Sequence, residues 1–329
     1  MRADRTAIGV DIGGTKIAAG LVDAEGRVTR RLEHATVGHE PWAVLETVTA
    51  LVAELGSGIP DAAVGVGAAG WINPEGSTVL FSPHLAWRNE PLRARLEAST
   101  ARSVLLSNDA DAAGWAEYRF GVARGQSHVV CLTLGTGIGG SIVVEGKLQR
   151  GRFGVAAEFG HQTIVPGGQR CACGNRGCWE QYASGNALAR EGRGLMAVHS
   201  PVAHALREAA GNDPHLVTGE MVTSLAASGD PACRELIIEA GQWLGRGLAN
   251  LAAVLDPGIF VIGGGLGSRV PLLVDTAKET YRANLSGRGY RPFAQVATAG
   301  SGQDAGLVGA ADLARRAQGQ GSPIASSEK

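Results

Sequence analysis

No apolar run in this sequence of 329 residues approaches the length of about 20 residues that a membrane-spanning helix needs. The first residues, MRADRTAIGVDIGG, also lack the apolar core of a secretory signal peptide. We therefore expect a soluble, cytoplasmic protein without a membrane partner.

An excess of charge of one sign is missing as well. The chain has 30 lysine and arginine residues against 31 aspartate and glutamate residues, which gives a net charge of −1 at pH 7. Such a balance provides no field that would attract nucleic acid or an anionic membrane surface. A small-molecule partner fits this composition better, and we expect no nucleic-acid partner.

No low-complexity linker precedes the polar tail, yet 329 residues are many for one core, so two domains with a cleft are expected. The 49 glycines sit in short clusters between apolar runs, which is typical of turns that approach ligands. The pattern predicts a mixed α/β fold whose second half repeats its opening. Expected strands cover 6–12, 17–23, 27–33, 129–134, 141–144 and 259–262, and expected helices cover 41–55, 110–119, most of 183–254 and the residues after Gly267.

The first glycine turn joins two expected strands. Its free backbone amides and one hydroxyl can point together at a phosphate, and the acid at the strand end can hold the water shell of Mg²⁺. The alternative is a tight hairpin with a surface lysine. The residues concerned are Asp11, Gly13, Gly14, Thr15 and Lys16.

The second glycine turn, 135–140, includes Gly135, Thr136 and Gly137. It matches the dinucleotide pattern G-x-G-x-x-G, but a strand-like Ser-Ile-Val-Val follows where a Rossmann fold needs a helix. A second match, 65–70, runs into Trp-Ile-Asn-Pro, which also excludes a helix, and no Walker A sequence occurs. Two related glycine hairpins, one per half, can grip a triphosphate when two lobes close. The actin-like ATPase fold binds its nucleotide in this way.

A third glycine cluster, Gly263, Gly264 and Gly265, follows a buried strand. Backbone without side chains offers a surface on which a flat adenine can lie. An ordinary strand-to-helix turn is the alternative that the sequence leaves open.

Asp109 follows Asn108 at the point where an apolar strand passes into a helix of small residues. Phosphoryl transfer to an alcohol needs a carboxylate that accepts the hydroxyl proton, and Asp109 can take this role. A simple helix N-cap is the alternative for Asp109. Asp111 is the weaker candidate for the base.

The chain has five cysteines, an odd number, and three of them lie close together. His161, Cys171, Cys173 and Cys178 supply the four ligands of a tetrahedral structural Zn²⁺. Buried free cysteines are the alternative, but the glycine-rich, polar surroundings favour a metal that pins the loop. Glu158 and Glu180 flank this loop as paired acids for a polyhydroxylated ligand, or alternatively as surface salt-bridge partners.

Together these segments resemble the ROK family of bacterial sugar kinases and sugar-responsive repressors, and within it the actinobacterial glucokinases, over about residues 6–316. DIGGTK is similar to the first phosphate motif of the family and LGTGIGG to the second. Glu158-Phe-Gly-His161 followed by CACGNRGCWE resembles the zinc and sugar signature. GQDAGLVGAADLA resembles the closing helix, which returns to the first lobe.

The resemblance implies a two-lobed, actin-like (ribonuclease H-like) ATPase fold with a zinc-pinned loop. Asp109 would be the base, Asn108, Glu158, His161 and Glu180 would contact the sugar, and ATP and Mg²⁺ would bind the glycine turns. His161 would serve the metal and the sugar through different ring nitrogens. The expected domains are 1–118 with the return helix 304–316, then 119–303, and a flexible tail at 317–329.

Four positions depart from the family pattern. Ser107 and Asp111 flank the expected base where the family has Glu-Asn-Asp-Ala-Asn. His84 stands where an asparagine follows proline, and Ser141 replaces the last glycine after the second motif. None of these removes a catalytic group, but Ser107, Asp111 and His84 lie close enough to the expected site to affect the choice of sugar.

We expect ATP-dependent phosphorylation of a hexose, with glucose giving glucose 6-phosphate. Rival specificities are fructose, mannose, N-acetylmannosamine or a polyphosphate donor, because pocket geometry decides them. A sugar-sensing repressor would carry a helix-turn-helix before DIGGTK, and the sequence leaves no room for one. A non-catalytic sugar-binding protein is a third rival. Resemblance also implies a homodimer or tetramer.

Overall fold

The computed structural model describes residues 6–36, 40–82 and 85–320. The chain divides into two compact units. The first comprises Met1–Cys131, Gly140–Ala157 and Gly300–Lys329, and the second comprises Leu132–Gly139 and Glu158–Ala299. Most of the predicted flexible tail lies outside the described residues, and residues 317–320 belong to the last helix.

Unit 1 is built on a five-stranded sheet with the order β3-β2-β1-β4-β8. Its first three strands form antiparallel hairpins, and β4 and β8 continue the sheet in parallel with β1. The carboxyl ends of β1, β4 and β8 therefore meet at one edge of the sheet. The strands are β1 (Ala7–Ile12), β2 (Lys16–Val22), β3 (Val28–Ala35), β4 (Val64–Ala68) and β8 (Val104–Asn108).

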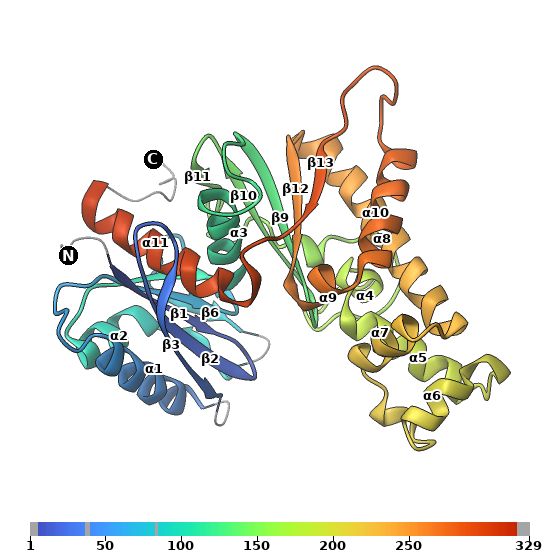
Figure 1. Ribbon diagram of the computed structural model, residues 1–329, viewed down its shortest axis with the longest axis horizontal. Coiled ribbons are helices and arrows are strands. Elements are labelled where there is room, and N and C mark those ends of the chain that lie inside the picture. Colours follow the sequence, from blue (N-terminus) through green and yellow to red (C-terminus); the bar gives the residue numbers. More distant parts are fainter. Residues whose placement is uncertain (1–5, 37–39, 83–84, 321–329) are drawn as a thin grey trace. The chain divides into compact units, whose positions relative to one another are not determined.

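Helices cover both faces of this sheet (Figure 1). On one face α1 (Pro41–Leu55) and α2 (Leu92–Thr100) bury their apolar residues, whereas α3 (Asp109–Arg119) and α11 (Ala305–Gln320) pack together on the other. Helix α11 lies directly on the strands, because a Cβ atom at Gly9 or Gly65 would collide with its backbone carbonyls. These glycines set the close approach of α11 to the sheet.

Two smaller pieces complete unit 1. A three-stranded antiparallel sheet contains β5 (Trp71–Ile72), β6 (Val79–Phe81) and β7 (Arg88–Glu90). The segment from β11 (Lys147–Leu148) to residue 157 packs on β5, since a Cβ atom at Gly154 would collide with the carbonyl of Ile72.

A second five-stranded sheet has the order β11-β10-β9-β12-β13. Hairpin strands again come first and are followed by parallel strands, so the order of the first sheet is repeated and the predicted duplication is confirmed. The additional strands are β9 (His128–Leu134), β10 (Ile138–Val144), β12 (Ile259–Gly263) and β13 (Gln295–Thr298).

Helices make up most of unit 2, as the pattern over 183–254 predicts. The long α8 packs along α10, and Gly241 and Gly245 of α8 let the two backbones approach. The predicted helix after Gly267 is α10, and the short α9, which begins within the glycine cluster itself, precedes it. The helices are α4 (Glu180–Ala183), α5 (Gly185–Ala197), α6 (His204–Ala209), α7 (Gly219–Ala227), α8 (Pro231–Leu255), α9 (Gly264–Arg269) and α10 (Pro271–Asn284).

Within the described part of the chain, no helix combines the length and the apolar character needed to cross a membrane.

Candidate functional site

The first glycine turn is a tight hairpin between β1 and β2. The amide of Gly13 donates to the carbonyl of Lys16 at 3.0 Å, and the Thr36 hydroxyl donates to the carbonyl of Gly13, also at 3.0 Å. The Lys16 ammonium is 3.2 Å from Glu33 Oε2 and 3.5 Å from Gln303 Oε1. The turn is therefore a tight hairpin, as one of the two interpretations of the sequence predicted. Phosphate binding by Gly13, Gly14 and Thr15 stays a prediction.

Three carboxylates of unit 1 act on one another at the end of β1. Burial, followed by the negative charge of Asp109, raises the pKa of Asp11 to about 7, and Asp304 adds to the effect while Lys16 opposes it. A cation beside Asp11 would relieve this repulsion, and carboxylate oxygen is a ligand that Mg²⁺ accepts. The donor set therefore fits the predicted magnesium at Asp11.

Asp109 begins helix α3, but it is not the helix cap. Asn108 is the N-cap, and its Oδ1 accepts from the amides of Ala110 at 2.9 Å and Asp111 at 3.1 Å. Asn108 Nδ2 donates to the carbonyl of Gly70 at 3.0 Å. The alternative that gave Asp109 the capping role was therefore wrong, because the preceding residue satisfies the free amides of the first turn.

Asp111 does not compete for the role of base. Its carboxylate is buried, and its Oδ2 lies 3.4 Å from Nε of the equally buried Arg150. Burial raises the pKa of Asp111 to about 7, although the charge of Arg150 opposes this shift. Sequence reasoning missed Arg150, because no local pattern connects residue 150 with a helix that begins at residue 109.

Two other departures from the family pattern, Ser107 and Ser141, also lie within unit 1. Ser107 is buried in β8, and Ser141 packs against Gly114 of α3, where an added Cβ atom would collide with the Ser141 hydroxyl. Ser141 therefore faces a helix backbone. His84 lies outside the described residues.

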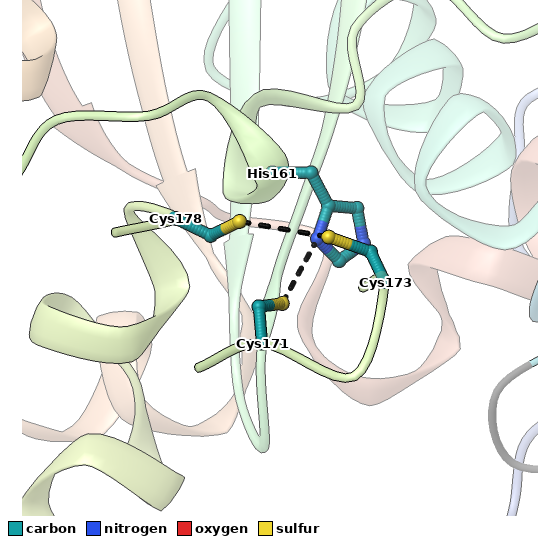
Figure 2. Close-up of side chains that lie close together, drawn as sticks. All are labelled: His161, Cys171, Cys173 and Cys178. Carbon is teal, nitrogen blue, oxygen red and sulfur yellow. Dashed lines mark hydrogen bonds between the residues drawn. The ribbon is translucent and has the colours of Figure 1, made fainter. Parts of the chain in front are cut away.

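In unit 2 the predicted zinc ligands come together (Figure 2). His161 Nδ1 is 3.5 Å from Cys171 Sγ, and the sulfur atoms of Cys173 and Cys178 are 3.6 Å apart. All four ligand atoms lie within 4.8 Å of one another. Zinc bonds of about 2.0–2.3 Å place tetrahedral ligands roughly 3.5–3.8 Å apart, so this donor set fits a closed zinc site.

Burial raises the pKa of the Cys171 and Cys178 thiols, so a bound cation is what would hold them as thiolates. The loop around them has its own anchor. Trp179 is fully buried against Gly247 of α8, and its indole Nε1 donates to the carbonyl of Trp243 at 3.0 Å. Sequence reasoning missed Trp179, since it adjoins the motif without being a ligand.

Glu158 and Glu180 lie on either side of the His161 ring. Glu158 Oε2 is 4.0 Å from His161 Nε2, and Glu180 Oε1 is 3.7 Å from His161 Nδ1. The Cys171 thiol also donates to Glu180 Oε1 at 3.1 Å. A Cβ atom at Gly137 would come within 2.6 Å of Glu180 Oε2, so the second glycine turn meets this acid.

The second glycine turn is braced by helix α5. Gly135 accepts the amide of Gly185 at 2.8 Å, and Thr136 accepts the amide of Asn186 at 3.3 Å. The third glycine cluster also meets the strand before this turn, since Gly264 has a φ of 77° and a Cβ atom there would collide with the backbone of Leu134. Glycine is therefore required at position 264.

A cavity of about 680 Å³ lies in unit 2, a volume within the range of small-molecule sites. Gly135, Thr136 and Gly265 line it, whereas Gly137 faces Glu180. No local sequence pattern indicates the charged lining of this cavity, because its residues come from separate helices and the loop before α7. These polar residues include Asn186, Arg193, Thr218, Glu220, Arg234 and Arg269.

The model of the ROK family matches residues 7–317. A glucokinase of Streptomyces coelicolor is 45% identical over 310 residues, which cover 94% of this chain and 97% of that protein. A glucokinase of Thermotoga maritima is 35% identical over 312 residues, or 93% of this chain and 96% of that protein.

Among solved structures, a ROK family glucokinase from Streptomyces griseus in complex with glucose and AMPPNP is 46% identical. The match has a TM-score of 0.85 and covers 94% of this chain and 99% of that one. The predicted α/β, actin-like ATPase fold is confirmed by this likeness.

Proposed function

This chain belongs to the ROK family, and we propose that it transfers the γ-phosphate of ATP to glucose, giving glucose 6-phosphate and ADP. The observation that supports this most directly is its 45% identity, over 94% of its length, to a glucokinase. The acid at position 109, the paired acids around His161 and the cavity beside the second glycine turn supply the groups that such a reaction needs.

Asp109 is proposed as the base. It accepts the proton of the sugar hydroxyl as the oxygen forms its bond to the γ-phosphorus and the bond to the ADP oxygen breaks. The transition state of phosphoryl transfer is loose, so alignment of the substrates and neutralisation of charge supply most of the acceleration. Because Asn108 satisfies the free amides of α3, the Asp109 side chain is not needed for capping.

Magnesium, when bound, neutralises the phosphate charges, and Asp11 is the residue proposed to hold its water shell. The amides of Gly13, Gly14 and Thr15, with the ammonium of Lys16, are proposed to face phosphate oxygens. Gly135, Thr136 and Gly137 of the second turn are proposed for the same nucleotide.

The cavity in unit 2 is proposed to hold the adenosine. Gly265 and the neighbouring Gly264 provide backbone surface for the adenine, and polar side chains surround the opening. Sugar hydroxyls are proposed to donate to Glu158 and Glu180, with Asn108 and the Nε2 atom of His161 as further contacts.

Zinc is proposed as a structural ion on His161, Cys171, Cys173 and Cys178. With four protein ligands the ion has no open position, so it fixes the loop and takes no part in the reaction. We further propose that the enzyme uses magnesium and acts in glycolysis. We also propose that it lies in the cytoplasm and assembles into a homodimer or tetramer.

A coupled assay of ADP release with Mg·ATP tests the function. The purified, zinc-loaded protein is offered glucose, fructose, mannose and N-acetylmannosamine, and then polyphosphate in place of ATP. We expect the highest kcat/KM with glucose and ATP, and almost none for Asp109→Asn. A different preferred sugar or donor would contradict the specificity, and clear sugar binding without turnover would contradict the catalytic role.

A further inference from the structure

A buried ion pair follows the proposed base by two residues along helix α3. Asp111 is 4% exposed and Arg150 is 2% exposed, and Nε of the arginine lies 3.4 Å from Oδ2 of the aspartate. Neither residue belongs to the proposed nucleotide, sugar, magnesium or zinc sites. Both lie in unit 1, so the pair can be considered within one compact body.

Arg150 connects this pair to the segment that contains β5. Its Nη2 atom donates to the carbonyls of Ile72 and Asn73, both at 3.3 Å. Its Nε and Nη1 atoms are buried and have no hydrogen-bond partner among the described residues. The guanidinium is therefore fixed by two backbone carbonyls and one carboxylate.

The same segment also holds the residue on the other side of the base. Asn108 Nδ2 donates to the carbonyl of Gly70 at 3.0 Å. Asp109 is thus flanked by two residues that are tied to residues 70–73, Asn108 directly and Asp111 through Arg150. Such bracketing fixes both the start of the helix and the direction of its first turn.

Stability does not account for the pair. Burial raises the pKa of Asp111 to about 7 and lowers the pKa of Arg150, so the charged form of each side chain is disfavoured by desolvation. A buried pair of this kind is often replaced by apolar residues without loss of stability. Two unsatisfied donors on the same guanidinium add to its cost.

We propose that Arg150 and Asp111 are positioning residues that hold the first turn of α3, and with it Asp109, in the geometry needed for phosphoryl transfer. This inference rests on the proposed function, in which Asp109 is the base. A displacement of a catalytic group by about 1 Å can lower turnover roughly 100-fold, so the pair should act on kcat.

The first experiment is a double-mutant cycle with Arg150→Met and Asp111→Leu. Each single variant is expected to lower kcat at least tenfold and to change KM for ATP and glucose less than threefold. The double variant should be no worse than either single one, because both changes break the same connection. Asp111→Asn should keep most of kcat, since an amide of the same shape still faces Nε of Arg150.

Arg152→Met is the matched control, because Arg152 lies in the same loop but is exposed and should leave kcat unchanged. If Arg150→Met does not fold, Arg150→Lys replaces it, with an expected loss between those of wild type and Arg150→Met. Unchanged kcat in both Arg150 variants, or additive losses in the cycle, would overturn the proposal.

Hydrogen exchange of the ligand-free protein separates this proposal from the proposed function. Arg150→Met should speed exchange at the amides of residues 110–113 at least tenfold, and Arg152→Met should not. Unchanged exchange at these amides would overturn the positioning role even if the enzyme is active. Faster exchange in a protein that does not phosphorylate glucose would support the positioning role and contradict the activity.

Discussion

The two glycine hairpins have the same place in two sheets of the same strand order, yet their surroundings differ. The first turn follows Asp11, whose pKa is raised to about 7 by burial and by the neighbouring carboxylate of Asp109. Among the described residues, the second turn meets the amides of α5, the side chain of Glu180 and a cavity.

This difference shows how two copies of one backbone arrangement can carry different side chains and so suit different ligands. Around the first turn, side chains concentrate negative charge, which suits a metal ion and a proton acceptor. Around the second turn, small residues and polar side chains leave room for ligands. The similarity lies in the hydrogen-bonded hairpins, and the difference lies in the side chains that surround them.

The largest effect should come from the acidic residues near the first glycine turn. Asp109→Asn is expected to lower kcat by about 10²–10⁴-fold, the usual contribution of a general base, with small changes in KM. The cap of α3 should be kept in this variant, because Asn108 provides it. In the matched variant Asn108→Ala, loss of the cap should lower the free energy of unfolding by about 1 kcal/mol. A stable Asp109→Asn enzyme with most of its turnover would contradict the assignment of the base.

The next prediction concerns the surroundings of the second turn, and it removes one ligand of the proposed zinc site. Cys178→Ser should lose the zinc, measured by atomic absorption, and raise KM for glucose at least tenfold, because Glu180 and His161 lose their fixed positions. The fold should survive, since Trp179 anchors the loop to α8 without the metal. Cys233→Ser, another fully buried cysteine but outside the cluster, is the control and should keep one zinc per chain. Full zinc content in Cys178→Ser would contradict the ligand set.

A smaller effect is expected at the contact between the second turn and Glu180. The methyl group of Gly137→Ala would stand 2.6 Å from Glu180 Oε2, so the carboxylate must shift. KM for glucose should rise several-fold in steady-state assays, with kcat less affected. Gly135→Ala is the matched control in the same turn, because an added Cβ atom there meets nothing within 4 Å. Equal KM values for the two variants would show that Glu180 does not depend on this contact.

Local sequence patterns were sufficient to predict much of this arrangement. Strand alternation and glycine punctuation predicted both hairpins, and the helices at 41–55 and 110–119 follow their expected ranges closely. The grouping of His161 with three cysteines also followed from spacing, because a metal site draws on few chemical types of ligand.

Other features depend on contacts between residues far apart in the sequence. Arg150 meets residues 72, 73 and 111, and no periodicity connects these positions. The arginines that line the cavity lie on α5, α8 and α9, where each would pass for an ordinary surface residue. Asn108 and Asp109 both suit a helix start, and only the hydrogen bonds show that Asn108 is the cap.

The smallest expected effect concerns the pH dependence of stability at Asp111. Its pKa rises from 3.8 to about 7 on folding, with burial as the main cause, so the folded chain binds this proton more tightly than the unfolded chain does. The contribution to stability is therefore fully present below pH 3.8 and is lost as the pH rises through about 7. Asp111→Asn removes this dependence, because its side chain does not titrate.

Urea unfolding at pH 5 and pH 8 measures this effect. The difference in unfolding free energy, variant minus wild type, should become more favourable to Asp111→Asn at pH 8. Asp61→Asn is the control, because Asp61 is exposed and its substitution should give the same difference at both pH values. A difference for Asp111→Asn that stays constant, or that changes in favour of wild type at pH 8, would mean that Arg150 compensates fully for burial. The buried pair would then stabilise unit 1 as well as position its helix.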